Sequence, residues 1–249
     1  MIVVLSGEGP TDFGASMSGA GMAVFEDIQF GPLAEMIEQL AFSILGYSPR
    51  ECAMYRLIDK SHLSERSKSL KALKKKSLAL PGKKRAEETA YFYANARALA
   101  DAAKEVAGEV GCDAVAILFR DSDGTASAGR GEWAAKRDSM LNGFAAEGYP
   151  LGVPMLANPK SEAGLLCALR PTPYQGCESL ENASGNDSSP NNLKNQLDTA
   201  LGEKANREVL RQLVADGRID PFKIDMPSFT DFKSRLELAL RDRPVGEQV

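Results

Sequence analysis

Short apolar runs alternate along the chain with longer segments in which apolar residues recur every three or four positions. The run IVVLSG at residues 2–7 is rich in β-branched residues and predicts a buried strand of a parallel sheet. The runs CAMYRLI at 52–58 and AVAILF at 114–119 predict two further strands, and YPLGVPMLA at 149–157 predicts an edge or late strand. Strands that alternate with helices indicate an α/β fold with a mainly parallel sheet.

Several segments have the spacing of an amphipathic helix. Residues 32–45 predict one, and Pro32 suits its first turn. The Ala-rich segment 85–110 predicts a long helix. Further helices are predicted at 131–148, from Ser161 as an N-cap, and in two or three parts of the tail.

Composition along the chain divides it into three parts. Residues 1–170 hold all the predicted strands, with a helical, basic insertion at about 60–110 and a flexible, glycine-rich loop at 14–25. Residues 171–192 are dense in Pro, Gly, Ser and Asn and predict a surface loop or linker. Residues 193–249 are predicted to form a helical C-terminal extension.

The overall composition is that of a globular protein. Of 249 residues, 43% are apolar and 26% are charged, and the net charge is −4, so the charge of the whole chain does not indicate a nucleic-acid binder. Four cysteines without a CxxC pair and a single histidine argue against a zinc site and a disulfide scaffold, and predict buried, reduced thiols. We expect a cytoplasmic protein without a membrane partner, since neither a signal peptide nor a membrane span is evident.

Two pairs of acidic residues follow predicted strands. Glu8 and Asp12 come after the first strand, and Asp121 and Asp123 come after AVAILF. Either pair alone could cap a helix or serve a tight turn. Together, they are expected at one edge of a parallel sheet, where ligands bind and where crowded carboxylates would repel one another. A hard divalent cation, Mg²⁺ or Mn²⁺, would relieve that repulsion.

The motifs EGPTD and DSDG, in this order, resemble those of the Toprim domain of primases, topoisomerases, recombination proteins of the RecR type and OLD-family nucleases. The resemblance implies a Rossmann-like Toprim core in which the aspartates hold Mg²⁺ and Glu8 binds metal or transfers protons. OLD-family nucleases share the second acid, here Asp12. They also carry a later glutamate, which NPKSEAGLL offers as Glu162, with Lys160 two residues before it.

The resemblance implies a metal-dependent nuclease. It is closest to OLD-family nucleases and to small stand-alone Toprim-like proteins associated with ABC-type ATPases in phage defence or DNA repair, which implies an ATPase partner. Those nucleases also use a downstream lysine, for which Lys194 and Lys233 are candidates. The interval between Glu8 and Asp121 is longer than a minimal Toprim core requires. A Toprim module that binds nucleic acid or a partner without catalysis is an alternative.

A second enzyme class shares part of the pattern. DSDGT, completed by Thr125, resembles the motif of haloacid-dehalogenase-like phosphatases, in which the first aspartate is the nucleophile. That motif normally opens its fold, whereas here about half of the chain precedes it. We rank this reading below the nuclease.

A basic segment interrupts this acidic protein. Residues 60–85 carry ten lysines and arginines against one acid, Glu65. The segment fits either a solvated helical face or a surface that follows a phosphate backbone, of DNA in preference to RNA. The candidate nucleic-acid contacts are Lys68, Lys71, Lys74, Lys75, Lys76, Lys83, Lys84 and Arg85. The sequence leaves the oligomeric state open.

Overall fold

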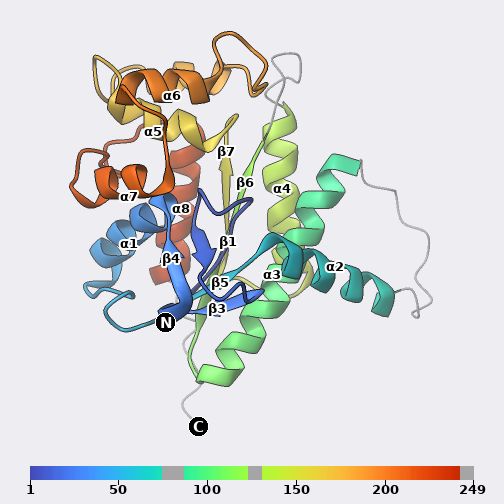
Figure 1. Cartoon of the computed structure of the whole chain (residues 1–249). Helices are drawn as coiled ribbons and strands as arrows, with labels where there is room; N and C mark the ends of the chain where they lie inside the picture. Colours follow the sequence, from blue (N-terminus) through green and yellow to red (C-terminus); the bar gives the residue numbers. More distant parts are fainter. Residues whose placement is uncertain (75–86, 123–130, 242–249) are drawn as a thin grey trace.

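A five-stranded sheet forms the centre of the protein (Figure 1). The computed structural model describes residues 1–74, 87–122 and 131–241. The strand order is β3-β5-β1-β6-β7, and only β3 runs antiparallel to its neighbour. The bounds are β1 Ile2–Ser6, β3 Met22–Val24, β5 Tyr55–Ile58, β6 Ala114–Asp121 and β7 Gly152–Ala157. The fold is therefore α/β, with the mostly parallel, Rossmann-like sheet that the apolar runs predict.

Strands β1 and β6 are direct neighbours. Ile2 pairs with Ala114 and Ser6 pairs with Leu118, so β6 continues to Asp121 beside the loop that leaves β1. Every residue of β1 is buried, because helices cover both faces of the sheet. The pairing brings the loop that starts at Gly7 next to the end of β6.

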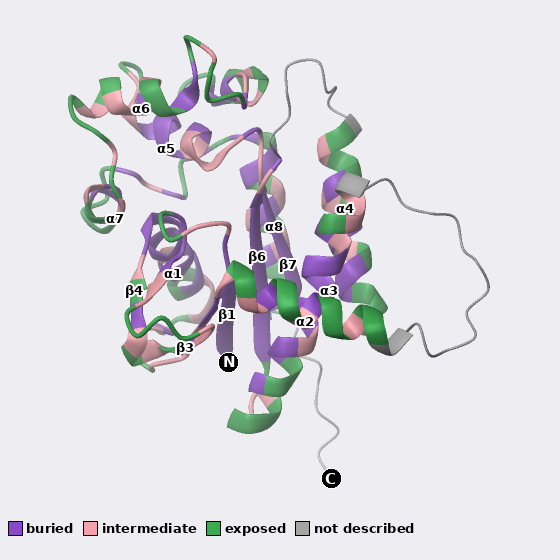
Figure 2. Ribbon diagram, turned by 45° about the vertical axis from the view of Figure 1, so that its right-hand side comes forward, coloured by how far each residue is buried: buried purple, intermediate pink, exposed green. Residues whose placement is uncertain are grey.

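Helices α3 (Glu87–Val110) and α4 (Gly131–Ala146) cover one face of the sheet, and α2 (Lys60–Lys74) packs outside α3 (Figures 1 and 2). Small side chains let α3 and α4 approach closely. A Cβ atom on Gly143 would lie 2.5 Å from the carbonyl oxygen of Tyr93 and 2.7 Å from Cβ of Ala96. Within the predicted insertion, α3 thus belongs to the packed layers of the core.

Helices α1 (Pro32–Leu45) and α8 (Pro227–Arg241) cover the other face. Toward the carboxyl ends of the strands lie α5 (Ser161–Leu169), the 3₁₀-helix η2 (Cys177–Asn182), α6 (Leu193–Leu201) and α7 (Arg207–Ala215) (Figure 1). Apolar residues of α6, α7 and α8 join the hydrophobic cluster of the sheet, among them Leu197, Val214 and Phe232. The C-terminal extension is therefore packed onto the same core.

The glycine-rich segment differs from its prediction as a flexible loop. Strand β2 (Gly14–Ser16) pairs with β4 (Ile28–Phe30) in a separate two-stranded sheet, and η1 (Phe25–Asp27) lies between β3 and β4. At Gly14 the backbone φ is +117°, and a Cβ there would lie 2.1 Å from the carbonyl oxygen of Gln29. The carboxylate of Asp27 accepts hydrogen bonds from the hydroxyls of Ser16 and Ser18. Close backbone pairing and polar contacts order the segment without large apolar side chains.

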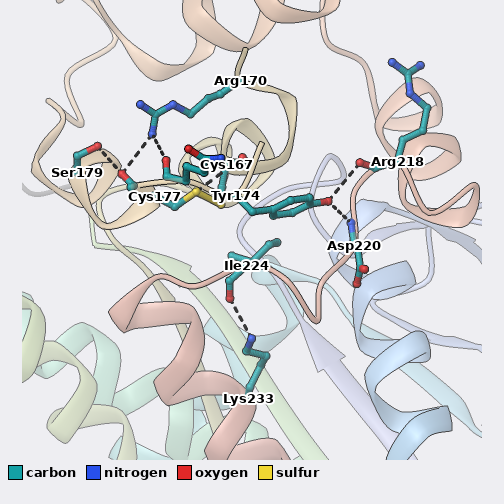
Figure 3. The surroundings of a disulfide bond; sticks show 11 residues. Cys167, Arg170, Tyr174, Cys177, Ser179, Arg218, Asp220, Ile224 and Lys233 are labelled. Atoms are coloured by element: carbon teal, nitrogen blue, oxygen red, sulfur yellow. Dashed lines mark hydrogen bonds between the residues drawn. A yellow bond between two sulfur atoms is a disulfide. The ribbon is translucent and has the colours of Figure 1, made fainter. Parts of the chain in front are cut away.

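The prediction of four reduced thiols is wrong for one pair. Cys167 of α5 and Cys177 of η2 form a buried disulfide (Figure 3), whereas Cys52 and Cys112 are free. Close packing of η2 against α5 brings the two sulfur atoms together, which their spacing in the sequence does not reveal. Within the described ranges, no helix combines the length and apolarity needed to cross a bilayer.

Candidate functional site

Four acidic side chains meet at the carboxyl edge of the sheet. Glu8 and Asp12 lie in the loop after β1, Asp121 ends β6, and Glu162 is in the first turn of α5. The chain moves from β1 to β5 on one side and later to β6 on the other, so β1 and β6 flank a topological switch point, where open α/β sheets bind ligands. The structure therefore brings together four of the five predicted metal ligands. Asp123, the fifth, lies outside the described residues.

The carboxylates influence one another's ionisation. The pKa of Asp121 is raised to about 8, mainly by burial and in addition by the charges of Asp12, Glu162 and Glu8, while the hydrogen bond from the Ser161 N–H opposes the rise. The pKa of Asp12 is raised to about 6, mainly by burial and in addition by the charges of Glu162 and Glu8, while a hydrogen bond from the Gly9 N–H opposes the rise. Negative charge in this cluster is thus incompletely compensated by the surrounding protein.

Backbone hydrogen bonds hold two of the acids. The N–H of Gly9 donates to Oδ2 of Asp12 over 3.1 Å, which closes the turn of the EGPTD segment. The N–H of Ser161 donates to Oδ1 of Asp121 over 3.0 Å. Ser161 is therefore the first residue of α5 and not its N-cap, a position that Lys160 occupies.

The donor chemistry of the cluster suits a hard cation. All four side chains offer carboxylate oxygens, and Mg²⁺ binds such oxygens while it keeps several of its waters. Within the part of the chain that the structure describes, no three Asp, Glu, His or Cys side chains are grouped so that they could hold a metal ion. The four described acids therefore lie close enough to shift the pKa values of Asp12 and Asp121, but they do not by themselves form a metal site.

Arg120 is a residue of the site that the sequence analysis missed. It lies on β6 beside Asp121, is 0% exposed, and donates hydrogen bonds to Oδ1 of Asn95 over 3.0 Å and to the carbonyl oxygen of Phe119 over 2.6 Å. Its Nε atom is 4.0 Å from Oε1 of Glu8. Burial lowers the pKa of Arg120, while Tyr91, Glu8 and Asp12 oppose the change. The available signal was an arginine directly between the apolar run AVAILF and Asp121, still within the predicted strand region.

Lys136 of α4 is a second missed cation. Its side chain is buried, and Nζ donates a 2.8 Å hydrogen bond to the carbonyl oxygen of Ser122, the residue after Asp121. The ammonium group therefore fixes the backbone at the end of β6. Nothing in the local sequence of α4 distinguishes Lys136 from a surface lysine.

The predicted lysines have different surroundings. Lys160 forms a 2.8 Å ion pair with Asp187, which directs its ammonium toward the 171–192 segment. Lys233 donates to the carbonyl oxygens of Ile224, over 2.9 Å, and Phe222, so it anchors the start of α8 (Figure 3). Of the two candidates for the downstream lysine, only Lys194 lines a cavity together with members of the acidic cluster.

Cavities open on two sides of the acids. One, of about 360 Å³, is lined by Glu8, the backbone of neighbouring glycines, Asp59 and Lys60. The other, of about 120 Å³, is lined by Asp12 and Glu162 together with residues of α6 and α7. The cluster is thus accessible from both the α2 side and the side of the extension.

Neither family models, nor curated proteins, nor solved structures give a match to this chain.

The basic segment is described in part. Lys68 and Lys71 are exposed on α2, whereas Arg66 pairs with Asp101, at 2.6 Å, and with Glu105 of α3. The side chain of Lys74 and all of Lys75, Lys76, Lys83, Lys84 and Arg85 lie outside the described residues. The first residue of α2, Lys60, lines the cavity beside Glu8, so the basic helix starts at the acidic cluster.

Proposed function

We propose that the protein is a Toprim-like, metal-dependent nuclease that hydrolyses phosphodiester bonds of nucleic acid. The observation that carries the proposal is the convergence of Glu8, Asp12, Asp121 and Glu162 at the switch point of the sheet, with the pKa of Asp121 raised to about 8. Uncompensated carboxylates in a cleft are a frequent feature of active sites and favour a dication. The motifs EGPTD and DSDG support the same reading through their resemblance to the Toprim domain.

The residues divide into metal holders and supporting groups. Asp121 and Asp123 would hold one Mg²⁺ or Mn²⁺, Glu8 and Asp12 would share a second, and Glu162 would support a metal or a water. Bound dications supply a nucleophilic water and neutralise charge on the phosphoryl group. Other groups would support these ligands. Arg120 would orient Glu8, and the Gly9 and Ser161 N–H groups would fix Asp12 and Asp121. Lys136 holds the backbone of Ser122.

Nucleic acid would approach along α2. Exposed Lys68 and Lys71 give α2 a positively charged face in an acidic protein, and Lys60 at the start of the same helix lines the cavity beside Glu8. Contacts of this kind recognise the phosphate backbone without reading the base sequence. DNA is the proposed polymer. The resemblance also favours control by an ABC-type ATPase partner.

Plasmid nicking with Mg²⁺ or Mn²⁺ tests the proposal. We expect Asp121→Asn and Glu8→Gln to abolish cleavage, because each removes a negatively charged oxygen ligand without a change in size. Glu109→Gln is the matched control, since Glu109 is exposed near the end of α3, away from the cluster. Full cleavage by both site variants would refute the nuclease. Metal binding and DNA binding without cleavage would favour the non-catalytic module, and turnover of small phosphomonoesters alone would favour the phosphatase.

A further inference from the structure

The C-terminal extension supplies one wall of the cavity beside the acidic cluster. From the sheet side, the cavity is lined by Asp12, Ser161 and Glu162, and from the extension it is lined by Lys194, Asn206 and Arg207. The two sides therefore carry opposite charges: carboxylates on one and an ammonium and a guanidinium on the other. Residues far apart in the sequence build this arrangement.

Arg207 connects the extension directly to the loop after β1 that carries Glu8 and Asp12. Its Nη1 atom donates to the carbonyl oxygen of Pro10 over 3.3 Å, and Nη2 donates to Oε1 of Gln29. Pro10 lies between Glu8 and Asp12 in the loop after β1. The side chain of Asn206 caps α7 by accepting a 3.0 Å hydrogen bond from the N–H of Val209, which fixes Arg207 as the first residue of the helix. The guanidinium therefore has a defined place at the cavity.

Helix starts converge on the same cavity. Pro32 of α1, Ser161 of α5, Lys194 of α6 and Arg207 of α7 all lie in first turns and all line it. The N-terminal end of a helix favours negative charge, so these helices add to the attraction that the two cationic side chains exert on an anion. No aromatic ring is among the described residues that line the cavity, which disfavours base stacking there.

We propose that this cavity is a phosphate-binding subsite for the nucleic-acid backbone, with Lys194 and Arg207 as its cations. The inference rests on the proposed nuclease function and adds the C-terminal extension to the substrate-binding surface. The volume of about 120 Å³ equals roughly four water molecules and accommodates one phosphate group. A strand bound there would reach the acids from the side opposite to Lys60 and α2. The subsite thus holds a phosphate next to the one that is cleaved.

The salt dependence of DNA binding tests the subsite. A short, fluorescently labelled DNA duplex is titrated with the full chain at several salt concentrations, with Ca²⁺ as the dication. We expect Arg207→Gln and Lys194→Gln each to lower the slope of log K against log salt by about one, because each removes one phosphate contact. Arg218→Gln is the matched control, because Arg218 is exposed on the extension and its guanidinium points away from Tyr174 and the disulfide (Figure 3).

Two further measurements distinguish failure of the subsite from failure of the proposed nuclease function. Arg207→Lys keeps the positive charge and should keep the salt slope of DNA binding. Lys194 is exposed, so Lys194→Gln still tests the subsite if Arg207→Gln does not fold. Thermal stabilisation by Mn²⁺ should persist in both glutamine variants and become smaller in Asp121→Asn. Slopes for Arg207→Gln and Lys194→Gln equal to that of Arg218→Gln would overturn the subsite. If Asp121→Asn kept the Mn²⁺ effect, the proposed function would fail instead.

Discussion

The backbone N–H of Ser161 donates a 3.0 Å hydrogen bond to Oδ1 of Asp121, and this contact joins the end of β6 to the start of α5. It places Glu162, the next residue of the helix, in the electrostatic field of Asp121. This hydrogen bond thus links the acid at the end of β6 to the acid in the first turn of α5. The nearby negative charges help to raise the pKa of Asp121.

Without metal, the protein should lose stability as the pH rises. The folded-state pKa of Asp121, about 8, exceeds the ordinary value of 3.8, so the folded state binds the proton more tightly than the unfolded state. The free energy of unfolding should therefore fall between about pH 4 and pH 8, on the order of a few kcal/mol in all. Asp121→Asn should flatten this decline, and Glu109→Gln should not. Thermal melts in EDTA across this range measure the effect, and equal pH profiles for wild type and Asp121→Asn would contradict it.

Added Mn²⁺ or Mg²⁺ should reverse the loss. Metal binds the deprotonated carboxylates, so the stabilisation should be larger at pH 8 than at pH 6. At a concentration of about 100 times Kd, the gain would be about 2.7 kcal/mol. Melts of wild type, Asp12→Asn and Asp121→Asn with and without metal test this, and both variants should show a smaller shift. A shift that is the same in all three proteins would place the metal elsewhere.

Replacement of Arg120 should affect both folding and activity. Arg120→Met removes a fully buried cation 4.0 Å from Glu8, and the bonds to Asn95 and Phe119 are lost with it. We expect a loss of about 3–5 kcal/mol in unfolding free energy, measured by urea titration.

The pH profile of cleavage separates the electrostatic role of Arg120 from its packing role. Arg120 lowers the pKa of Asp12, so Arg120→Met should move the acidic limb of the profile to higher pH. Arg120→Lys keeps the charge and should restore the limb in part. An unchanged limb in a folded Arg120→Met protein would assign Arg120 to packing alone.

Replacement of exposed lysines on α2 by neutral residues should weaken DNA binding and reduce its dependence on salt concentration. Lys68→Gln and Lys71→Gln together should lower the salt slope by about two, since each lysine releases about one counterion when it meets a phosphate. Lys223→Gln is the control, because Lys223 is exposed but pairs with Asp220 at 3.2 Å, near the start of α8. If the double variant and the control gave the same slope, this face of α2 would serve only as a solvated helical surface.

The disulfide predicts how many cysteines react with an alkylating agent before and after reduction. Alkylation of the denatured, unreduced protein should modify Cys52 and Cys112 only, and prior reduction should expose Cys167 and Cys177 as well. Loss of the disulfide by Cys177→Ser should lower the unfolding free energy by about 2–3 kcal/mol, since it frees a short loop in the unfolded chain. Four reactive thiols before reduction would contradict the pairing.

The sequence by itself determined the main helices, the parallel strands and the edge of the sheet where the acids lie. Helix α1 has the predicted bounds, Pro32–Leu45, because its apolar spacing and its proline are local signals. Strands β1 and β6 are apolar and β-branched, and acids that follow parallel strands must share one edge of the sheet. That much of the site needed no coordinates.

Only the tertiary structure decided which strands are neighbours and which distant residues complete the site. The β1–β6 pairing, the burial of Arg120 behind Glu8, the Cys167–Cys177 bond and the contact from Arg207 to Pro10 all join segments through packing. Such contacts depend on the three-dimensional order of the layers, and they leave no periodic pattern along the chain. Local preferences act over a few residues, whereas burial and charge pairing are set by neighbours that the chain supplies from far away.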